Sequence, residues 1–456
     1  MGMLLSQQDG RPAHLTRVHK ALAGLDEPDQ LRLGVMEKWK TGSHLLTYRQ
    51  VERTYWLVCR ALSKPEPDGT PSQKLSEVVD ALVEASVASA YKTQTRSLAV
   101  DWTDLESFAR PPLKDRASKD KEASWGHRAG EGPAGSDEIF FGYYLQAATM
   151  VRQERGPKVP ELARRILLTA CSKDPVPAFV PVLQRMHASG IAVGDVLADS
   201  AYAYRSAANW AAPLRAIGAK LVQDMHPGDR GPKGTFAGAI ICNGNLYCPA
   251  VPAPLLALGP AARDVSKQQL AEHDLQSAQF SAYKLGRITA HDQDGYHRVM
   301  CPAVMGKVRC PHREESMTLP LSKPEVLAAP QPAPSCCTQK TVTVPAEVCA
   351  KTAQKHDYPS KAHRQSYKRR TSAERTFASI KDPATNDISR GWCRVLGVAP
   401  ITPFLACLFV TRNLRIADNF EQRRDKELLN PPGKCSRPKR RKTLADLAGA
   451  PTGSPP

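Results

Sequence analysis

The chain has 456 residues, enough for two or three domains with a substantial core. Its 63 Lys and Arg residues outnumber its 45 Asp and Glu residues by 18, which favours a polyanionic partner, nucleic acid before a membrane surface. The longest apolar stretch, 404–410, is too short to span a bilayer, the N-terminus lacks a signal-peptide pattern, and twelve irregularly spaced cysteines do not resemble a secreted disulfide scaffold. These features favour a cytoplasmic protein with no membrane segment.

Residues 1–95 are predicted to form a helical domain. A helix with proline in its first turn is expected over 27–39, followed by a turn at 41–43. Thr47 can cap the next helix, because a threonine side chain can accept hydrogen bonds from the first free backbone N–H groups. The apolar spacing around 75–82 predicts a third helix.

Two arginines suggest a use for this helical region. Arg49 and Arg53 lie on the polar face of the helix that Thr47 begins, opposite its apolar stripe. A helix, a Gly-containing turn and a helix with basic residues at its start outline a helix-turn-helix, a common DNA-binding unit. Any small helical bundle gives the same pattern, so these residues leave both interpretations open.

Between 96 and 226 the pattern changes to strands that alternate with helices. A polar, charged stretch at 113–137 is expected to be a hairpin loop. The order predicts an α/β core with a mixed sheet. The expected elements are strands at 98–101, 139–151 and 162–171, a helix at 178–189, a strand at 192–199, a helix at 205–217 and a strand at 220–225.

The remainder of the chain falls into three parts. Residues 227–358 are rich in Pro, Gly and Cys and predict a partly β insertion. The α/β pattern resumes over 359–420, where helices are expected at 364–381 and 401–416. Residues 421–456 are polar and Pro-rich, contain a run of four basic residues, and predict a disordered basic tail.

Cysteines of the insertion raise the question of a structural metal. Three of them are followed by proline, as in some zinc knuckles, but no Cys-x2-Cys pair exists. Ordinary buried or loop thiols are therefore favoured over a structural zinc site, which is the less favoured alternative. The candidate ligands are Cys242, Cys248, Cys301, Cys310, His312, Cys336, Cys337 and Cys349.

One segment near the C-terminal third places four functional side chains on one helix face. Tyr367, Arg370, Glu374 and Lys381 fall at offsets 0, 3, 7 and 14, which at about 100° per residue share an arc roughly 60° wide. A carboxylate in a row of phosphate-binding groups suits a metal-dependent enzyme that acts on a nucleic-acid backbone. A solvated basic face with an Arg370–Glu374 ion pair is the alternative. Further basic residues that could follow a phosphate backbone are Lys368, Arg369 and Arg375.

Two aspartates follow apolar strands in the same way, Asp101 after Leu-Ala-Val and Asp199 after Val-Leu-Ala. A carboxylate at a strand end is a common metal platform, although a helix cap or turn explains either residue alone. With Glu374 they would supply three oxygen ligands for Mg²⁺ or Mn²⁺. Asp195 has the same strand parity as Asp199, but it lies at the strand start and is not expected to be catalytic.

These three carboxylates, together with the Tyr-x2-Arg-x3-Glu-x6-Lys spacing that begins at Tyr367, resemble the catalytic triad and the Tyr-Arg-Glu-Lys motif of one branch of the DDE transposases of bacterial insertion sequences. The intervals also fit: Asp199 lies 98 residues after Asp101, and Glu374 lies 175 residues after Asp199. The resemblance covers about 95–416 of the chain, with 227–358 as an insertion in the longer interval.

The resemblance implies a fold and an activity. The core would be ribonuclease H-like, with two Mg²⁺ or Mn²⁺ ions held by Asp101, Asp199 and Glu374. Tyr367, Arg370 and Lys381 would contact phosphates near the transposon end. The reaction would be hydrolysis at that end, followed by attack of the freed 3′-hydroxyl on target DNA.

A homodimer on double-stranded DNA is expected, because two transposon ends must be brought together, and the expected location is the bacterial cytoplasm, at the nucleoid. A nuclease of the same fold that does not join strands is one alternative, and an inactive or domesticated sequence-specific DNA-binding protein is the other.

Overall fold

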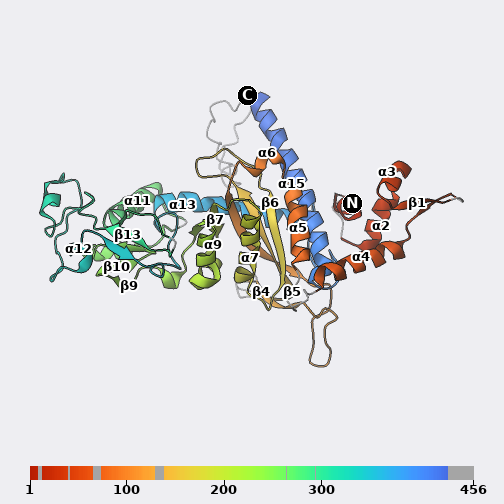
Figure 1. Ribbon diagram of the computed structural model, residues 1–456, viewed down its shortest axis with the longest axis horizontal. Helices are drawn as coiled ribbons and strands as arrows, with labels where there is room; N and C mark the ends of the chain where they lie inside the picture. Colours follow the sequence, from red (N-terminus) through yellow and green to blue (C-terminus); the bar gives the residue numbers. More distant parts are fainter. Residues whose placement is uncertain are drawn as a thin grey trace, which may run out of the picture.

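The computed structural model describes residues 1–8, 13–39, 42–64, 73–128, 138–262, 264–292 and 294–429. The four-residue basic run of the predicted tail and most of its other residues lie outside these ranges. The described chain is elongated, with a central sheet, the insertion at one end and the first helices at the other (Figure 1). No helix of the described residues is long and apolar enough to cross a membrane.

A mixed sheet of six strands forms the centre of the molecule, and the predicted α/β class is confirmed. Three strands, β3, β5 and β6, are antiparallel neighbours, whereas β7 runs parallel to β3 and β8 runs parallel to β7. The order is therefore β6-β5-β3-β7-β8, and β4 pairs with the first residues of β5. The strands are β3 (Ser97–Glu106), β4 (Ser124–Arg128), β5 (Glu138–Val151), β6 (Ala163–Ala170), β7 (Asp195–Ala198) and β8 (Lys220–Gln223).

Strand β3 is longer than its sequence predicts. The expectation that it ends at Asp101 is wrong, since pairing with the long strand β5 continues to Glu106 and Leu105 is buried again in the core. Polar residues in the second half of β3 are thus held in a strand by the partner backbone. The predicted loop at 113–137 likewise contains a strand, β4, and its residues 129–137 lie outside the described part of the chain.

Helices cover both faces of the sheet, and the strand alternation decides which side chains each layer meets. On one face α7 (Pro175–Ala188) and α9 (Ala212–Ala216), which follows a π-helical turn (Ala207–Ala211), pack on Leu98 and Val100 of β3. On the other face α14 (Thr371–Lys381) packs on Ala99, and α15 (Val398–Leu429) continues this layer. Asp101 shares the parity of Ala99, so it faces α14.

The first helices differ from the prediction in one place. The helix expected over 27–39 ends at Arg32, because Gly34 takes a positive φ of 69° and the chain then forms a β-hairpin. Thr47 begins the next helix as predicted, with a capping box to Gln50. The elements are α1 (Gly2–Gln8), α2 (Leu15–Ala23), α3 (Glu27–Arg32), β1 (Met36–Trp39), β2 (Gly42–Leu45), α4 (Tyr48–Ser63), α5 (Lys74–Ala85) and α6 (Ser89–Lys92).

The insertion is partly β, as expected, but it also contains a 16-residue helix, α11 (Lys267–Ala282). Its strands form two small three-stranded sheets, β11-β10-β9 and β12-β13-β14. These are β9 (Pro232–Phe236), β10 (Ala239–Cys242), β11 (Asn245–Tyr247), β12 (Gly286–Arg287), β13 (His297–Met300) and β14 (Val342–Val344), and the further helices are α10 (Ala253–Leu256) and α12 (Ser335–Thr338) with 3-10 turns at Pro227–Asp229 and Glu314–Thr318.

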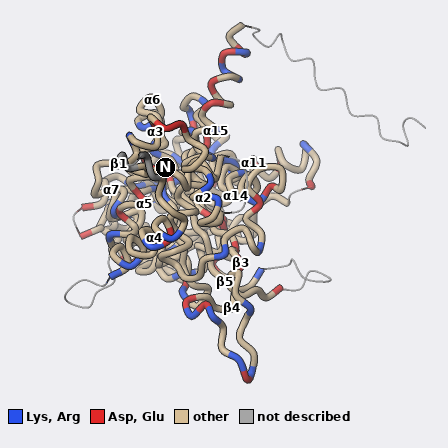
Figure 2. Tube along the Cα trace, turned by 90° about the vertical axis from the view of Figure 1, so that its right-hand side faces the viewer, with Lys and Arg blue, Asp and Glu red and all other residues tan. Residues whose placement is uncertain are grey.

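Two helical predictions near the C-terminus need correction. The helix expected at 364–381 is α13 (Lys361–Tyr367), a 3-10 turn η5 (Lys368–Arg370) and α14, so it is not one regular α-helix. Helix α15 runs to Leu429, so residues 421–429 are helical rather than part of a disordered tail. Basic and acidic residues alternate along this exposed end (Figure 2), which gives it the charge pattern of a solvated helix.

Candidate carboxylate site at the edge of the sheet

Asp101 and Asp199 lie side by side where two parallel strands part. Strands β3 and β7 pair through Ala99 and Leu197, and each aspartate lies two residues further along its own chain. Residues two apart on a strand face the same side, and Ala373 of α14 packs against Ala99 and Leu197 on that side. The structure therefore brings together two carboxylates that are far apart in sequence, beneath the helix that carries Glu374.

Backbone contacts orient both carboxylates. Asp199 ends β7 and caps the short helix α8 (Ser200–Ala203), where its Oδ1 accepts a hydrogen bond from the Ala201 N–H at 3.0 Å. Asp101 lies inside β3, and its Oδ1 accepts from the Trp102 N–H at 2.9 Å. The sequence leaves a helix cap open as the alternative role of Asp199. In the structure Asp199 both caps α8 and lies next to Asp101.

The pair is electrostatically unfavourable as it stands. Burial raises the pKa of Asp101 to about 7, and the negative charge of Asp199 adds to this shift. Burial also raises the pKa of Asp199, against the opposing charge of Arg370. Two carboxylates in one poorly hydrated site cannot both ionise without a compensating cation. Hard oxygen donors that repel each other in this way fit a divalent cation such as Mg²⁺ or Mn²⁺.

The positive charge of Arg370 partly compensates the two aspartates, and Arg370 also forms an ion pair with Glu374. Its Nη1 lies 3.4 Å from Oδ2 of Asp101, and its Nη2 donates to the Glu374 carboxylate. The guanidinium also lies 5.7 Å from the ring centre of Tyr367. Among the described residues no three Cys, His, Asp or Glu side chains converge closely enough to hold a metal ion. Glu374 would join the two aspartates only after Arg370 releases it.

Lys381, the fourth residue of the predicted row, lies at the far end of the site. Its Nζ contacts Oδ1 of Asp104 at 2.7 Å, and Asp104 also accepts from Arg128 at 2.7 Å. Burial alone would raise the pKa of Asp104, but hydrogen bonds from these two cations outweigh it and lower the pKa. Arg370 thus contacts both Tyr367 and Glu374 of the row, whereas Lys381 forms an ion pair with Asp104.

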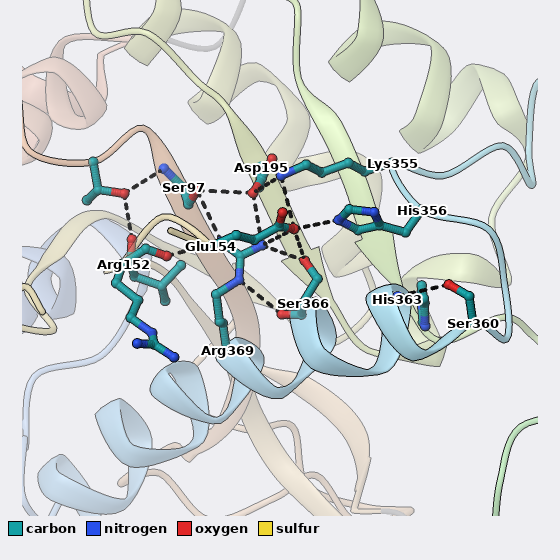
Figure 3. Close-up of polar contacts among 12 residues, drawn as sticks. Ser97, Arg152, Glu154, Asp195, Lys355, His356, Ser360, His363, Ser366 and Arg369 are labelled. Carbon is teal, nitrogen blue, oxygen red and sulfur yellow. Dashed lines mark hydrogen bonds and ion pairs between the residues drawn. The ribbon is translucent and has the colours of Figure 1, made fainter. Parts of the chain in front are cut away.

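Arg369 is not available as a DNA contact, which corrects the sequence prediction. Its side chain is only 5% exposed, and its Nη2 lies 2.9 Å from Oδ2 of Asp195 and 3.3 Å from Oε1 of Glu154. Figure 3 shows the guanidinium pointing from the helix toward these acids. Adjacent residues on a helix point in directions about 100° apart. The two neighbouring arginines therefore serve different partners, Arg369 inside the protein and Arg370 at the carboxylate site.

The same acids also bind the end of the insertion. Lys355 Nζ lies 2.8 Å from Asp195 and 3.0 Å from Glu154, and His356 Nε2 lies 2.6 Å from Glu154 (Figure 3). Burial would raise the pKa of Glu154, but hydrogen bonds from Ser366, His356 and Lys355 lower it to about 2. Asp195, which the sequence excludes from catalysis, is therefore an internal anchor for cations from the helix and the insertion.

The other predicted DNA contacts lie outside the carboxylate site. Lys368 is exposed, and the Arg375 guanidinium bonds Glu161. Both line a cavity of about 750 Å³ with Arg152 and Arg155, and none of the three candidate carboxylates lines it. On α4, Arg49 and Arg53 are exposed as predicted, in the group of N-terminal helices that packs on α15.

Two residues of the site were missed from the sequence. Asp224 directly follows β8, as Asp199 follows β7, and its charge acts on both Asp199 and Tyr367. The repeated pattern of an apolar strand followed by Asp could have found it. Tyr202 is fully buried beneath the two aspartates, whose charges add to burial in raising its pKa, and its hydroxyl has no hydrogen-bond partner among the described residues. No sequence pattern indicates that contact.

The geometry of the site is thus a pair of repelling carboxylates, a third carboxylate held nearby by arginine, and a phenol beside them. Comparisons of the chain with protein-family models, with curated proteins and with solved structures find no match.

Proposed function

We propose that the chain is a DDE transposase that cleaves the ends of a DNA element and joins them to target DNA. One observation carries the proposal: Asp101 and Asp199 each lie two residues beyond a paired position of two adjacent parallel strands, and the helix that bears Glu374 packs on those paired residues, Ala99 and Leu197. Electrostatic coupling supports it, since the charges of Asp199 and Glu374, after burial, help to raise the pKa of Asp101.

The arrangement of the sheet supports a ribonuclease H-like core. Three antiparallel strands, β6-β5-β3, are followed across the sheet by two strands parallel to β3, and this is the order expected of that fold. The proposed catalytic aspartates come from the first and fourth strands of this five-stranded series in chain order, β3 and β7. The third carboxylate comes from a helix that follows the insertion, as the sequence resemblance implies.

The proposed chemistry divides between cations and protein. Two Mg²⁺ or Mn²⁺ ions held by Asp101, Asp199 and Glu374 would activate the attacking oxygen and stabilise the leaving oxygen of a phosphodiester. Asp101 must be deprotonated to serve, so its raised pKa predicts an activity that increases from pH 6 to pH 8. A DNA phosphate competes for the guanidinium of Arg370, and on binding there it frees Glu374.

The proposed partners follow from this reaction. Double-stranded DNA is bound both as element end and as target, and a homodimer holds the two ends together. The proposed site of action is the bacterial nucleoid in the cytoplasm. The excess of 18 positive charges supports a polyanionic partner.

A cellular excision assay tests the proposal. A marker is bracketed by the DNA that flanks the gene, and wild type is compared with Asp199→Asn and Glu374→Gln. Loss of the marker with wild type alone is expected. The Glu374→Gln protein should bind end DNA normally, because the substitution preserves the shape of a half-exposed side chain and removes only its charge.

The two alternatives have different outcomes. A nuclease that does not join strands would cleave end DNA with divalent metal but give no insertion products. A binding-only protein is favoured by the ion pair that keeps Glu374 on Arg370, and it would show no metal-dependent cleavage in any version. Cleavage by Glu374→Gln at the wild-type rate would contradict the role of the third carboxylate.

Binding through α4 is a separate prediction. Substitution of Arg49 and Arg53 by Ala should weaken the binding of end DNA about tenfold and reduce the slope of log affinity against log salt by about 2, one unit for each lost phosphate contact. Fluorescence anisotropy at several salt concentrations measures both quantities. Arg423→Ala, an equally exposed arginine on α15, is the matched control and should leave binding unchanged. An unchanged salt slope in the double variant would remove α4 from the DNA interface.

A further inference from the structure

A basic cavity lies beside the helical segment of the candidate site, on a different face of that segment. Its volume is about 750 Å³, and its walls are the loop that joins β5 to β6, the helices α13 and α14, and Phe420 of α15. Six Lys and Arg side chains line it against only two carboxylates, so positive charge is concentrated in one hollow. The cations are Arg152, Arg155, Lys158, Lys368, Arg369 and Arg375, and the acids are Glu154 and Glu161.

Both carboxylates of the basic cavity are already paired with cations of the protein. Lys355 Nζ lies 3.0 Å from Glu154, and His356 Nε2 lies 2.6 Å from it. Glu161 accepts a hydrogen bond from Nε of Arg375 at 2.9 Å. These two acids therefore do not balance the remaining cations that line the cavity.

Three of those cations have no partner within the described part of the chain. Arg152, Arg155 and Lys368 are exposed, and their charged groups form no hydrogen bond or ion pair with a described residue. Figure 3 shows the guanidinium of Arg152 turned away from Glu154 and Asp195. An internal ion pair thus explains Arg369 but not these three side chains, which remain free to bind an external anion.

Helical spacing separates the basic cavity from the carboxylate site by a short distance. Lys368 and Arg375 lie seven residues apart, about two turns, and both line the cavity, whereas Arg370 and Glu374 do not. A helix with its side chains is about 10–12 Å wide, and DNA rises about 3.4 Å per base pair. About three base pairs therefore reach from one face of this helix to the other.

We propose that the basic cavity is a second binding site for the DNA backbone, which holds phosphates about three base pairs from the phosphate at the carboxylate site. The proposal rests on the proposed function, because the DNA at Arg370 is its point of reference. The guanidinium groups of Arg152 and Arg155 can each bind two phosphate oxygens. The cavity has the size of a small-molecule pocket, so it admits the backbone of one strand and not a whole duplex.

DNA is favoured over an acidic polypeptide as the occupant of the basic cavity. The cavity and the carboxylate site lie on one helical segment, and a DNA strand carries charge continuously from one to the other. An acidic polypeptide would need its own separate contact here. Binding of polyglutamate that is lost in a cavity variant, with DNA binding retained, would assign the cavity to an acidic protein and overturn the proposal.

DNA binding without cleavage tests the basic cavity. Wild type and the double variant Arg152→Ala, Arg155→Ala are titrated in EDTA with duplexes of the DNA that flanks the gene and of unrelated sequence, at several salt concentrations. The double variant should bind both duplexes about tenfold more weakly, and its slope of log affinity against log salt should be smaller by about 2. Its melting temperature should equal that of wild type, since both side chains are exposed and unpartnered among the described residues.

The double variant Arg287→Ala, Arg298→Ala is the matched control. Both arginines are exposed, on β12 and β13 of the insertion, and neither lines the basic cavity. The control loses the same charge as the cavity variant and should keep the wild-type affinity and salt slope. Equal weakening by the control would show an effect of total charge and overturn the proposal, as would an unchanged slope in the cavity variant.

Uncharged phosphates locate the contact on the DNA. Methylphosphonates placed about two to four base pairs on either side of the cleavage position should weaken the binding of wild type and have no further effect on the Arg152→Ala, Arg155→Ala protein. Full additivity of the two changes would overturn the assigned position. Cleavage by wild type together with undiminished DNA binding by the cavity variant would refute the cavity alone, whereas wild type that binds no duplex would refute the proposed function as well.

Discussion

The Asp101→Asn protein is expected to have no detectable DNA cleavage and yet to be more stable than wild type when divalent metal is absent. The physical reason is the unfavourable charge of Asp101 in its buried site beside Asp199. An asparagine keeps the hydrogen bond from the Trp102 N–H and carries no charge. A pKa raised from 3.8 to about 7 corresponds to about 4 kcal/mol, so a gain of about 1–4 kcal/mol in the free energy of unfolding is expected at pH 8.

The contribution of Asp101 to the free energy of unfolding is expected to fall as the pH rises. Between pH 4 and pH 7 the folded protein holds the proton of Asp101 and the unfolded chain does not, so the folded state binds more protons. Stability from this group therefore falls as the pH rises through that window, and the loss is complete above pH 7. Urea unfolding of wild type at pH 5 and pH 8, with EDTA, should show this fall, and Asp101→Asn should show less of it.

Asp104→Asn is the matched control on the same strand. Hydrogen bonds from Arg128 and Lys381 outweigh burial and lower the pKa of Asp104, so its charge stabilises the fold and its removal should destabilise the protein at pH 8. Opposite signs for the two substitutions on β3 are therefore expected. Equal destabilisation by both would contradict the repelling pair.

Added divalent metal should make wild type more stable than Asp101→Asn, the reverse of the order expected without metal. Mg²⁺ or Mn²⁺ bound only to the folded state raises the melting temperature of wild type, and the rise should grow from pH 6 to pH 8 as Asp101 loses its proton. Asp101→Asn and Asp199→Asn should show little or no rise. Differential scanning fluorimetry measures this first without DNA, where only the two aspartates are free to bind metal, and then with end DNA, which is expected to release Glu374 from Arg370. No rise in either condition would contradict the metal site.

How much of this site could be predicted depends on the range of the interactions involved. The α/β class follows from local patterns, because apolar strands and amphipathic helices leave periodic signals. The convergence of Asp101 and Asp199 could be expected from their shared position after apolar strands. The β1–β2 hairpin was missed because a positive φ at Gly34, rather than a hydrophobic period, ends α3.

The i,i+4 ion pair between Arg370 and Glu374, expected under the alternative interpretation, is confirmed, but the partners that come from distant segments could not be predicted. Lys368, Arg369 and Arg370 are consecutive basic residues that were all predicted to contact phosphate. The structure leaves Lys368 exposed, buries Arg369 against Asp195 and places Arg370 beside Asp101. Helical periodicity predicts that neighbouring side chains diverge, but it does not reveal which acids from distant strands they meet. The sequence therefore identifies a candidate segment but not the distant partner of each residue within it.

Substitution of Arg369 best distinguishes a buried ion pair from a phosphate contact at this segment. Arg369→Met should destabilise the protein by about 3–5 kcal/mol, because it leaves Asp195 and Glu154 with fewer cations in a site from which water is largely excluded. Lys368→Met, the exposed neighbour without an ion pair among the described residues, should change the stability by less than about 0.5 kcal/mol. Urea unfolding at pH 7 measures both.

Measurements of DNA binding should rank the two variants in the opposite order and so distinguish an anchoring role of Arg369 from a DNA contact. If Arg369 contacted phosphate, as its sequence context indicates, Arg369→Met would weaken DNA binding and leave the unfolding curve unchanged. If it anchors the helix instead, the folded fraction of Arg369→Met at low temperature should bind DNA nearly as tightly as wild type, whereas Lys368→Met should bind more weakly. A double-mutant cycle with Asp195→Asn should show coupling of about 0.5–3 kcal/mol in stability, since the two side chains share one ion pair. The anchor matters for the proposed chemistry because Arg369 and Arg370 are consecutive: the buried ion pair of the first fixes where the second meets Asp101.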